Sequence, residues 1–278
     1  MRIICDAPGQ TCNRLWTYVS SVARCVVEHR KMMIIFYDWT IECFPYLLHC
    51  PFIYFPLFHP WYLNHGNGWN NYKGLTWKAT HDPKVDRLFR FLGFTKGWQT
   101  RRETQYLEMA KPQLQQLFRP ADHITSRTDA LLSQILSDHT VLIGLHIRRG
   151  DYATWHDGRF FYSLEEYHQC MCRIRALFPD EKVAFFISSN EKFSTDRFEG
   201  CDCYRFEDEP HGDILDLHTL SCCHYIAGPF STFSRWASFI GNVPLCFIAR
   251  AAQSFHLNDF SPIVDFFHFA NGTEIADW

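Results

Sequence analysis

Residues 141–152 read VLIGLHIRRGDY, an apolar run that ends abruptly in two arginines, a glycine and an aspartate. The apolar part is typical of a strand buried on both faces of a parallel sheet. Side chains alternate along a strand, so His146 and Arg148 share one face while Arg149 points to the other. Packing does not explain two adjacent arginines at the end of such a strand. We interpret this strand end as an anion site.

The two arginines differ in how strongly they indicate a ligand. A guanidinium held at a strand end can bind two oxygens of one phosphate, which is the role that we favour for Arg148. The alternative is an ordinary surface ion pair, for example Arg149 with Asp151. For Arg149 both interpretations stay open.

Two glycine-containing turns each lead from a strand into a helix, and their helix starts offer backbone N–H groups to an anion. One is residues 228–234, GPFSTFS, where Ser231 or Thr232 is alternatively an ordinary helix cap. Beside a strand-end arginine, phosphate binding is favoured. The other is residues 9–15, GQTCNRL. It lacks the G-x-G-x-x-G pattern, and the chain has no Walker A sequence, which disfavours NAD enzymes and P-loop ATPases.

Alternating strand and helix patterns flank an aromatic-rich middle at residues 44–98. Such alternation predicts parallel sheets, and the fold class is α/β with two Rossmann-like domains, 1–138 and 139–278, that face a cleft. Within helix 101–117, Pro112 is expected to cause an interruption. The expected strands are 2–5, 32–36, 141–147, 183–188, 203–206, 225–227 and 244–248, and the expected helices are 13–30, 101–117, 126–136, 164–178, 213–223 and 233–240.

Composition limits the partners of the chain. With 278 residues and a formal net charge of −3, no global basic field attracts nucleic acid. No signal peptide is visible and no run reaches the roughly 20 apolar residues of a membrane span, so a cytoplasmic location is expected, with peripheral membrane association left open. The 12 cysteines are interpreted as reduced thiols. Their close pairs, such as Cys170 with Cys172, are two residues apart and chelate poorly, so no metal is predicted.

Several motifs resemble a known family, the α-1,2-fucosyltransferases. Residues 146–152 resemble its H-x-R-R-x-D motif, and residues 216–221 with 231–238 resemble its second motif, where Arg235 replaces a tryptophan. Residues 185–191 resemble a further strand of the family. The turn of Gly9, Gln10 and Asn13 is similar to the one that opens these enzymes and the protein O-fucosyltransferases.

The resemblance implies a GT-B fold and an inverting, metal-independent transfer of fucose from GDP-fucose, without a cofactor, to a hydroxyl of a glycan in carbohydrate biosynthesis. By motif position Arg148 would hold the β-phosphate. Asp151 would be the catalytic base or merely hold Arg149, although a base is not required if the phosphate takes the proton. The other implied site residues are catalytic Asn13 and substrate-binding His146, Arg149, Gly9, Gln10, Ser231, Thr232 and Phe233, with Asp213 on the guanine in competition with Asp208, Glu209 and Asp216.

Two alternatives remain open. The chain could be a transferase for another nucleotide sugar, or a non-catalytic protein that binds GDP-sugars or glycans on the same scaffold. The aromatic middle, with Trp61, Tyr62, Trp69, Tyr72 and Trp77, could form an acceptor platform, although core packing is the commoner use of such residues. The sequence gives no signal for the acceptor or the oligomeric state.

Overall fold

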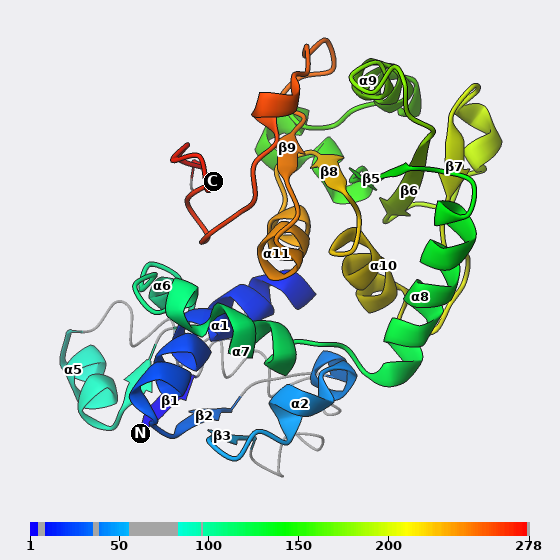
Figure 1. Cartoon of the computed structure of the whole chain (residues 1–278). Coiled ribbons are helices and arrows are strands. Elements are labelled where there is room, and N and C mark those ends of the chain that lie inside the picture. Colours follow the sequence, from blue (N-terminus) through cyan, green and yellow to red (C-terminus); the bar gives the residue numbers. More distant parts are fainter. Residues whose placement is uncertain (5–8, 36–38, 56–82, 96, 277–278) are drawn as a thin grey trace. The chain divides into compact units, whose positions relative to one another are not determined.

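The computed structural model describes residues 1–4, 9–35, 39–55, 83–95 and 97–276. The chain divides into two compact units, Met1–Ala121 and Asp122–Trp278, each with a parallel sheet and helices (Figure 1). The predicted α/β class is confirmed. The division lies before helix α8 (Asp122–Leu136), whereas the sequence placed it after that helix. Thr128 of α8 explains the difference, because its hydroxyl lies 3.0 Å from that of Thr219 in the second unit.

The second unit is built on five parallel strands in the order β7-β6-β5-β8-β9. The apolar run at 141–147 forms the central strand, as its composition predicts, and every other expected strand of this unit is present. Their bounds are β5 (Val141–Ile147), β6 (Val183–Ser189), β7 (Asp202–Tyr204), β8 (Tyr225–Gly228) and β9 (Leu245–Phe247).

Helices cover both faces of this sheet (Figure 1). Helix α9 (Leu164–Arg175) packs on the face that presents Ile143, Leu145 and Ile147, together with apolar residues of the helix itself. It begins with a capping box of Ser163 and Glu166, a serine followed three residues later by a glutamate, which is a sequence pattern that predicts a helix start. Helices α8, α10 (Gly212–Leu220) and α11 (Thr232–Gly241) pack on the face to which Leu142, Gly144 and His146 belong.

The first unit has four parallel strands in the order β3-β2-β1-β4. The long helix α1 buries Leu15, Val19, Val22 and Ala23, which recur at three- and four-residue spacing in the sequence. The bounds are β1 (Arg2–Ile4), α1 (Thr11–Glu28), β2 (Met32–Ile34), η1 (Trp39–Cys43), α2 (Pro45–Leu48), β3 (Ile53–Tyr54), α5 (Pro83–Phe91), β4 (Phe94–Thr95), α6 (Gly97–Thr100) and α7 (Leu107–Leu117).

The expected break at Pro112 is wrong, because α7 continues through this residue. The helix begins at Leu107 rather than near residue 101, and Pro112 lies in its middle. There the proline removes the bond from its own nitrogen to the carbonyl of Glu108. Helix α7 packs on α1, which supplies the burial that keeps it intact.

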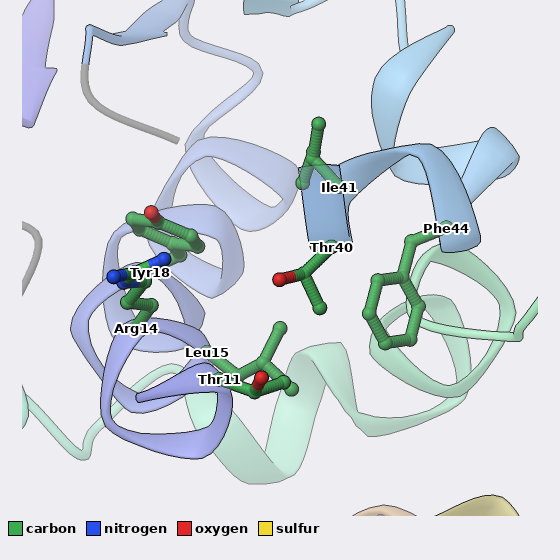
Figure 2. A pocket seen from close by; sticks show the side chains of 7 residues that line it. All are labelled: Thr11, Arg14, Leu15, Tyr18, Thr40, Ile41 and Phe44. Carbon is green, nitrogen blue, oxygen red and sulfur yellow. The ribbon is translucent and has the colours of Figure 1, made fainter. Parts of the chain in front are cut away.

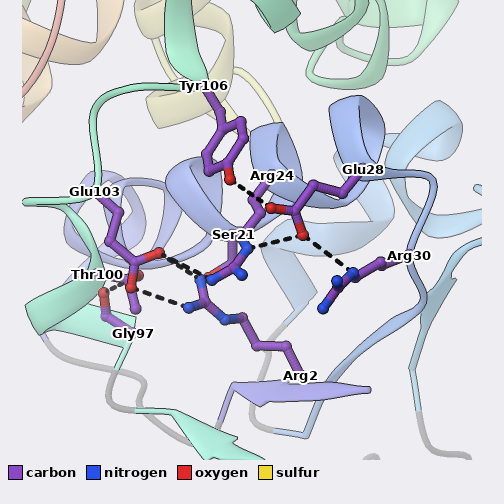
Figure 3. A network of polar contacts seen from close by, with 9 residues as sticks. All are labelled: Arg2, Ser21, Arg24, Glu28, Arg30, Gly97, Thr100, Glu103 and Tyr106. Carbon is purple, nitrogen blue, oxygen red and sulfur yellow. Dashed lines mark hydrogen bonds and ion pairs between the residues drawn. The ribbon is translucent and has the colours of Figure 1, made fainter.

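A polar network joins β1, α1 and the segment before α7 (Figure 3). Arg2 donates from Nη1 and Nη2 to the two carboxylate oxygens of Glu103, at 2.9 and 3.0 Å, and from Nη1 to the hydroxyl of Ser21 at 3.1 Å. Glu28 accepts from the Tyr106 hydroxyl and pairs with Arg30 at 3.1 Å. The contact between Arg2 and Glu103 is forked and largely buried, while the contact between Glu28 and Arg30 is exposed on the arginine side.

This contrast gives a stability prediction. The Arg2 side chain is 17% exposed, so Arg2→Ala leaves Glu103 without its forked partner and is expected to lower the free energy of unfolding by about 1–3 kcal/mol. The Arg30 side chain is 69% exposed, and Arg30→Ala is expected to change it too little to measure. Urea unfolding followed by fluorescence compares the two variants. Equal losses would show that Arg2 contributes no more than an exposed ion pair.

Candidate functional site

The site is built at one edge of the second sheet, where β5 and β8 end. These strands are parallel neighbours, so the residues that follow them leave the sheet at the same edge. The Tyr152 hydroxyl, after β5, donates to the carbonyl of Phe230, after β8, at 2.5 Å. Arg148 and Ser231, which the sequence expects to act together, are therefore brought to the same edge.

His146 is buried at the end of β5 under the first turn of α11. Its Nδ1 lies 2.9 Å from the hydroxyl of Ser234, and its ring centroid lies 5.0 Å from that of Phe233. Burial, with the nearby Arg148 charge second, lowers the pKa of His146 to about 3. The imidazole is therefore neutral near pH 7. It packs under the first turn of α11, to which the sequence analysis assigned phosphate binding.

Gly228 ends β8 directly beside this histidine. A Cβ at position 228 would lie 2.8 Å from the carbonyl oxygen of His146 and 2.9 Å from its Cβ. The two strand ends can approach this closely only because residue 228 is a glycine. The glycine of the 228–234 turn is thus required by packing against β5.

Arg148 is held in a defined position by Asp151. Its Nε lies 2.8 Å from one carboxylate oxygen, and Nη2 donates to the other at 2.9 Å. The guanidinium carbon also lies 5.9 Å from the ring centroid of Tyr152. The Arg148 side chain is mostly buried, whereas Asp151 is exposed, so the forked pair sits where the sheet edge meets solvent.

Asp151 does not hold Arg149, so that alternative is wrong. Arg149 instead lies with Nη1 at 3.4 Å from a carboxylate oxygen of Glu191, and its guanidinium carbon is 5.1 Å from the ring centroid of Phe161. The physical reason is the 3-10 turn η2 (Gly150–Ala153), which places Asp151 one turn beyond Arg148. The two arginines point in different directions.

Two residues that follow β6 hold the arginine turn in place. The backbone N–H of Arg149 donates to the side-chain oxygen of Asn190, and that of Gly150 donates to Glu191, both at 3.1 Å. Sequence analysis did not select Asn190 or Glu191 as site residues. Their position directly after a buried strand, at the same sheet edge as Arg148, is the signal that could have found them.

The first turn of α11 adopts the capped form. Ser231 is the N-cap, with extended backbone (φ −150°, ψ 143°), and its hydroxyl accepts from the N–H of Phe233 at 3.1 Å. The capping interpretation of Ser231 is therefore confirmed. Capping does not compete with anion binding, because a helix start presents several N–H groups and the cap accepts from one of them.

Of the two carboxylates Asp213 and Asp216, it is Asp216 that contacts the end of β6. Asp213 is exposed on the first turn of α10. Burial raises the pKa of Asp216 to about 7, against the opposing effects of its hydrogen bond with Ser188 and of the Arg205 charge. Ser188 is the β6 partner of His146 in the sheet register. Among the carboxylates that compete for the guanine role, Asp216 of α10 therefore contacts β6 at the residue that pairs with His146 of β5.

Arg235, the residue at which the chain differs from the motif that it resembles, is buried and holds the C-terminal segment. It is only 4% exposed, and it donates from Nη1 to the carbonyl of Phe266 at 3.0 Å and from Nη2 to that of Ala276 at 3.2 Å. Its guanidinium carbon lies 4.7 Å from the ring centroid of Phe266. Arg235 thus fixes the C-terminal segment to α11, and a tryptophan could not supply these two donors.

The Gly9 turn is assembled separately in the first unit. Gly9 has a φ of +55°, a conformation that favours glycine, and a Cβ there would lie 2.2 Å from the side-chain nitrogen of Asn13. Arg14 donates from Nη2 to the Gly9 carbonyl at 3.1 Å. Gln10 is the N-cap residue of α1, without a side-chain capping bond. Gly9, Gln10 and Asn13 therefore form one tight turn at a helix start, as expected.

A small pocket lies beside the first turns of α1 (Figure 2). Its empty space of about 240 Å³ includes open solvent, and we assign no ligand to it. It is lined by Thr11, Arg14, Leu15, Tyr18, Thr40, Ile41 and Phe44. The aromatic residues considered for the acceptor, Trp61, Tyr62, Trp69, Tyr72 and Trp77, lie outside the described residues.

Solved fucosyltransferases share this fold. The fucosyltransferase NodZ from Bradyrhizobium matches with a TM-score of 0.50 and 18% identity over 87% of this chain and 93% of that one. A mutant of FUT1 from Arabidopsis thaliana in complex with GDP matches with a TM-score of 0.60 and 13% identity, over 99% and 79%. POFUT1 in complex with GDP-fucose matches with a TM-score of 0.53 and 10% identity, over 91% and 94%.

At these identities the likeness shows the fold, which is the predicted pair of Rossmann-like domains of GT-B type. No protein-family model and no curated protein sequence matches the chain. Within the part of the chain that the structure describes, every helix is too short or too polar to cross a membrane.

Proposed function

We propose that this chain is an inverting fucosyltransferase that transfers fucose from GDP-fucose to a hydroxyl of a glycan acceptor. The observation that carries the proposal is the forked guanidinium of Arg148 at the same sheet edge as the first turn of α11. Support for the donor comes from the shared fold, since the similar structures include NodZ soaked with GDP-fucose and POFUT1 in complex with it.

Arg148 is the proposed partner of the β-phosphate. Breaking the bond between the sugar carbon C1 and the phosphate oxygen leaves negative charge on that oxygen, and one well-placed donor in such a site is commonly worth about 3–4 kcal/mol. Before the donor arrives, Asp151 holds the guanidinium fork in position. The diphosphate then replaces the Asp151 carboxylate on Arg148, and the N–H groups around Ser231, Thr232 and Phe233 bind the remaining oxygens.

In the proposed reaction the proton of the acceptor hydroxyl passes to the departing phosphate. The acceptor oxygen attacks C1 from the side opposite the diphosphate, so that the new bond forms as the old one breaks and the configuration inverts. Because both oxygens of Asp151 contact Arg148, we assign Asp151 to orienting that arginine, and the departing phosphate takes the proton. A catalytic role for Asn13 is proposed from its position in the motif alone. A base role for Asp151 would instead require it to leave Arg148 during the reaction.

Asp216 is proposed as the acceptor of the guanine N–H groups, in place of the expected Asp213. Only an ionised carboxylate accepts both N–H groups, and the pKa of Asp216 is about 7. The proportion of the ionised form falls as the pH drops below that value. We therefore expect the KM for GDP-fucose to be constant above pH 8 and to rise roughly tenfold per unit below pH 6.

Initial rates between pH 5 and pH 9 measure this dependence. In Asp216→Asn the KM is expected to be high and to lose the rise below pH 7, while Asp213→Asn serves as the matched control and keeps it. A rise of the same size in Asp216→Asn would remove Asp216 from the guanine site.

The test of the function is release of GDP by the purified protein from GDP-fucose in the presence of glycan acceptors. Transfer with GDP-fucose in the presence of EDTA is the expected result. Faster turnover with another GDP-sugar or a UDP-sugar would replace the donor in this proposal. Binding of GDP-fucose without GDP release, whatever the acceptor, would establish the non-catalytic alternative.

The linkage and the location are also part of the proposal. The motif at residues 146–152 resembles that of α-1,2-fucosyltransferases, and we propose an α-1,2 product, although the similar NodZ is an α-1,6-fucosyltransferase. Nuclear magnetic resonance of the product assigns the linkage directly. A cytoplasmic location fits the cysteines of the described residues, all of which are free thiols.

A further inference from the structure

A second cluster of chemically reactive side chains lies away from the donor site, between α9 and the start of β7. One ring nitrogen of His168 and the sulfur atoms of Cys172 and Cys201 all lie within 4.8 Å of one another. All three side chains are half-buried. Cys201 directly precedes β7, at the amino end of a strand, whereas Arg148 and Ser231 follow the carboxyl ends of strands. The cluster is therefore not part of the proposed donor site.

The secondary structure explains why these three side chains meet. His168 and Cys172 are four residues apart on α9, so they lie on one face of the helix, one turn apart. The loop of Phe198 packs on the same helix, with its ring centroid 5.9 Å from that of His168. This loop continues directly into Cys201. A pair on one helix and a third residue from a neighbouring loop is a common way to assemble a metal site.

The imidazole of His168 is already oriented by the backbone. Its Nε2 lies 2.9 Å from the carbonyl oxygen of Glu199, a distance at which Nε2–H donates to that oxygen. With the proton on Nε2, the lone pair is on Nδ1. Histidines that bind metals are typically held in this way, by donation from the other ring nitrogen to a carbonyl or carboxylate.

The dimensions fit a tetrahedral metal ion. Zinc bonds of about 2.3 Å to sulfur and about 2.0 Å to nitrogen place tetrahedral ligand atoms about 3.5–3.8 Å apart. The limit of 4.8 Å among the three atoms therefore requires only a small inward movement of the side chains. One imidazole nitrogen with two thiolates is a donor set that favours Zn²⁺ over Mg²⁺ or Ca²⁺.

We propose that His168, Cys172 and Cys201 bind one zinc ion through Nδ1 and two thiolates, with water as the fourth ligand. Binding releases the two thiol protons to solvent and changes no oxidation state. The ion joins α9 to the loop before the edge strand β7. The sequence predicted no metal because its close cysteine pairs are two residues apart, but here a spacing of four on a helix is completed by a residue distant in the sequence.

Cobalt is the probe for this site. The full-length protein is reduced, freed of metal with a chelator and titrated with Co²⁺ without oxygen. We expect one equivalent to give the visible bands of tetrahedral cobalt and the near-ultraviolet band of thiolate bonds, and one equivalent of Zn²⁺ to abolish both. Absence of the thiolate band in the reduced protein would overturn the proposal. A disulfide between Cys172 and Cys201 that survives the reduction and prevents Co²⁺ binding would overturn it as well.

Variants identify the ligands. Cys172→Ser and Cys201→Ser are each expected to weaken Co²⁺ binding at least tenfold and to reduce the thiolate band, and His168→Ala to weaken binding similarly while both thiolates remain. Cys222→Ser, which changes an exposed cysteine elsewhere in the same unit, is the matched control and keeps the native spectrum. Native spectra in Cys172→Ser or Cys201→Ser would overturn the assignment. Circular dichroism checks the folding of each variant, and no readout depends on sugar transfer.

Discussion

Replacing Arg148 by alanine is expected to lower kcat/KM for GDP-fucose by about 10²–10³-fold, because the leaving phosphate loses its forked donor. Arg148→Lys is expected to fail nearly as badly. A lysine ammonium is a point charge and does not offer the two separate N–H groups that the guanidinium places near the two oxygens of Asp151. Initial-rate measurements of GDP release across donor concentrations give both values.

A loss of activity in Arg148→Ala can be distinguished from misfolding. The Asp151 carboxylate that Arg148 contacts is exposed, so loss of the guanidinium leaves no buried charge behind and the variant is expected to fold. Asp151→Asn keeps the shape but weakens the grip on Arg148, and a smaller loss of rate is expected. Arg159→Ala, at an exposed arginine near the same loops, is the control with native rates. Near-native turnover in Arg148→Ala would end the assignment of Arg148 to the phosphate.

The second large effect is expected at Arg235. Arg235→Ala is expected to lower the free energy of unfolding of the second unit by about 3–5 kcal/mol, because it leaves a cavity and removes both donors from the buried carbonyls of Phe266 and Ala276. Arg235→Trp, which introduces the tryptophan of the motif that residues 231–238 resemble, is also expected to destabilise the protein, since an indole offers one donor and cannot satisfy two carbonyls.

Urea unfolding measures the loss at Arg235, and limited proteolysis locates it. The C-terminal segment from residue 249 is expected to be cut first in Arg235→Ala, since that residue holds the segment to α11. Arg250→Ala, at an exposed arginine of the same segment, is the control with native stability. If Arg235→Trp proved as stable as the native protein, the two carbonyl contacts would contribute little to stability.

Local patterns predicted the elements of the second unit well. The central strand β5 follows from its apolar composition, the start of α9 from the Ser163 and Glu166 pair, and the start of α11 from Ser231. Each of these signals acts within a few residues, so it needs no knowledge of distant contacts. The alternation of strands and helices then fixed the α/β class, because parallel strands require helical crossovers.

Two differences from the expectations concern contacts that the spacing of residues along the chain does not reveal. Helix α8 belongs with α10 through Thr128 and Thr219, which are far apart in the sequence. Asp151 contacts Arg148 rather than Arg149 because a 3-10 turn sets its direction. Spacing alone could not report either contact.

The sequence by itself determined the α/β class, the central strand and the sheet edge that an arginine and a helix start share. These features depend on the apolar periodicity and on the polar residues at strand ends, which involve only residues that are close in the sequence. Tertiary structure alone decided which carboxylate contacts the sheet, since Asp216 rather than Asp213 lies beside Ser188. It alone also brought Cys201 to His168 and Cys172. Burial and close approach depend on the packing of distant segments, and that packing has no local signature.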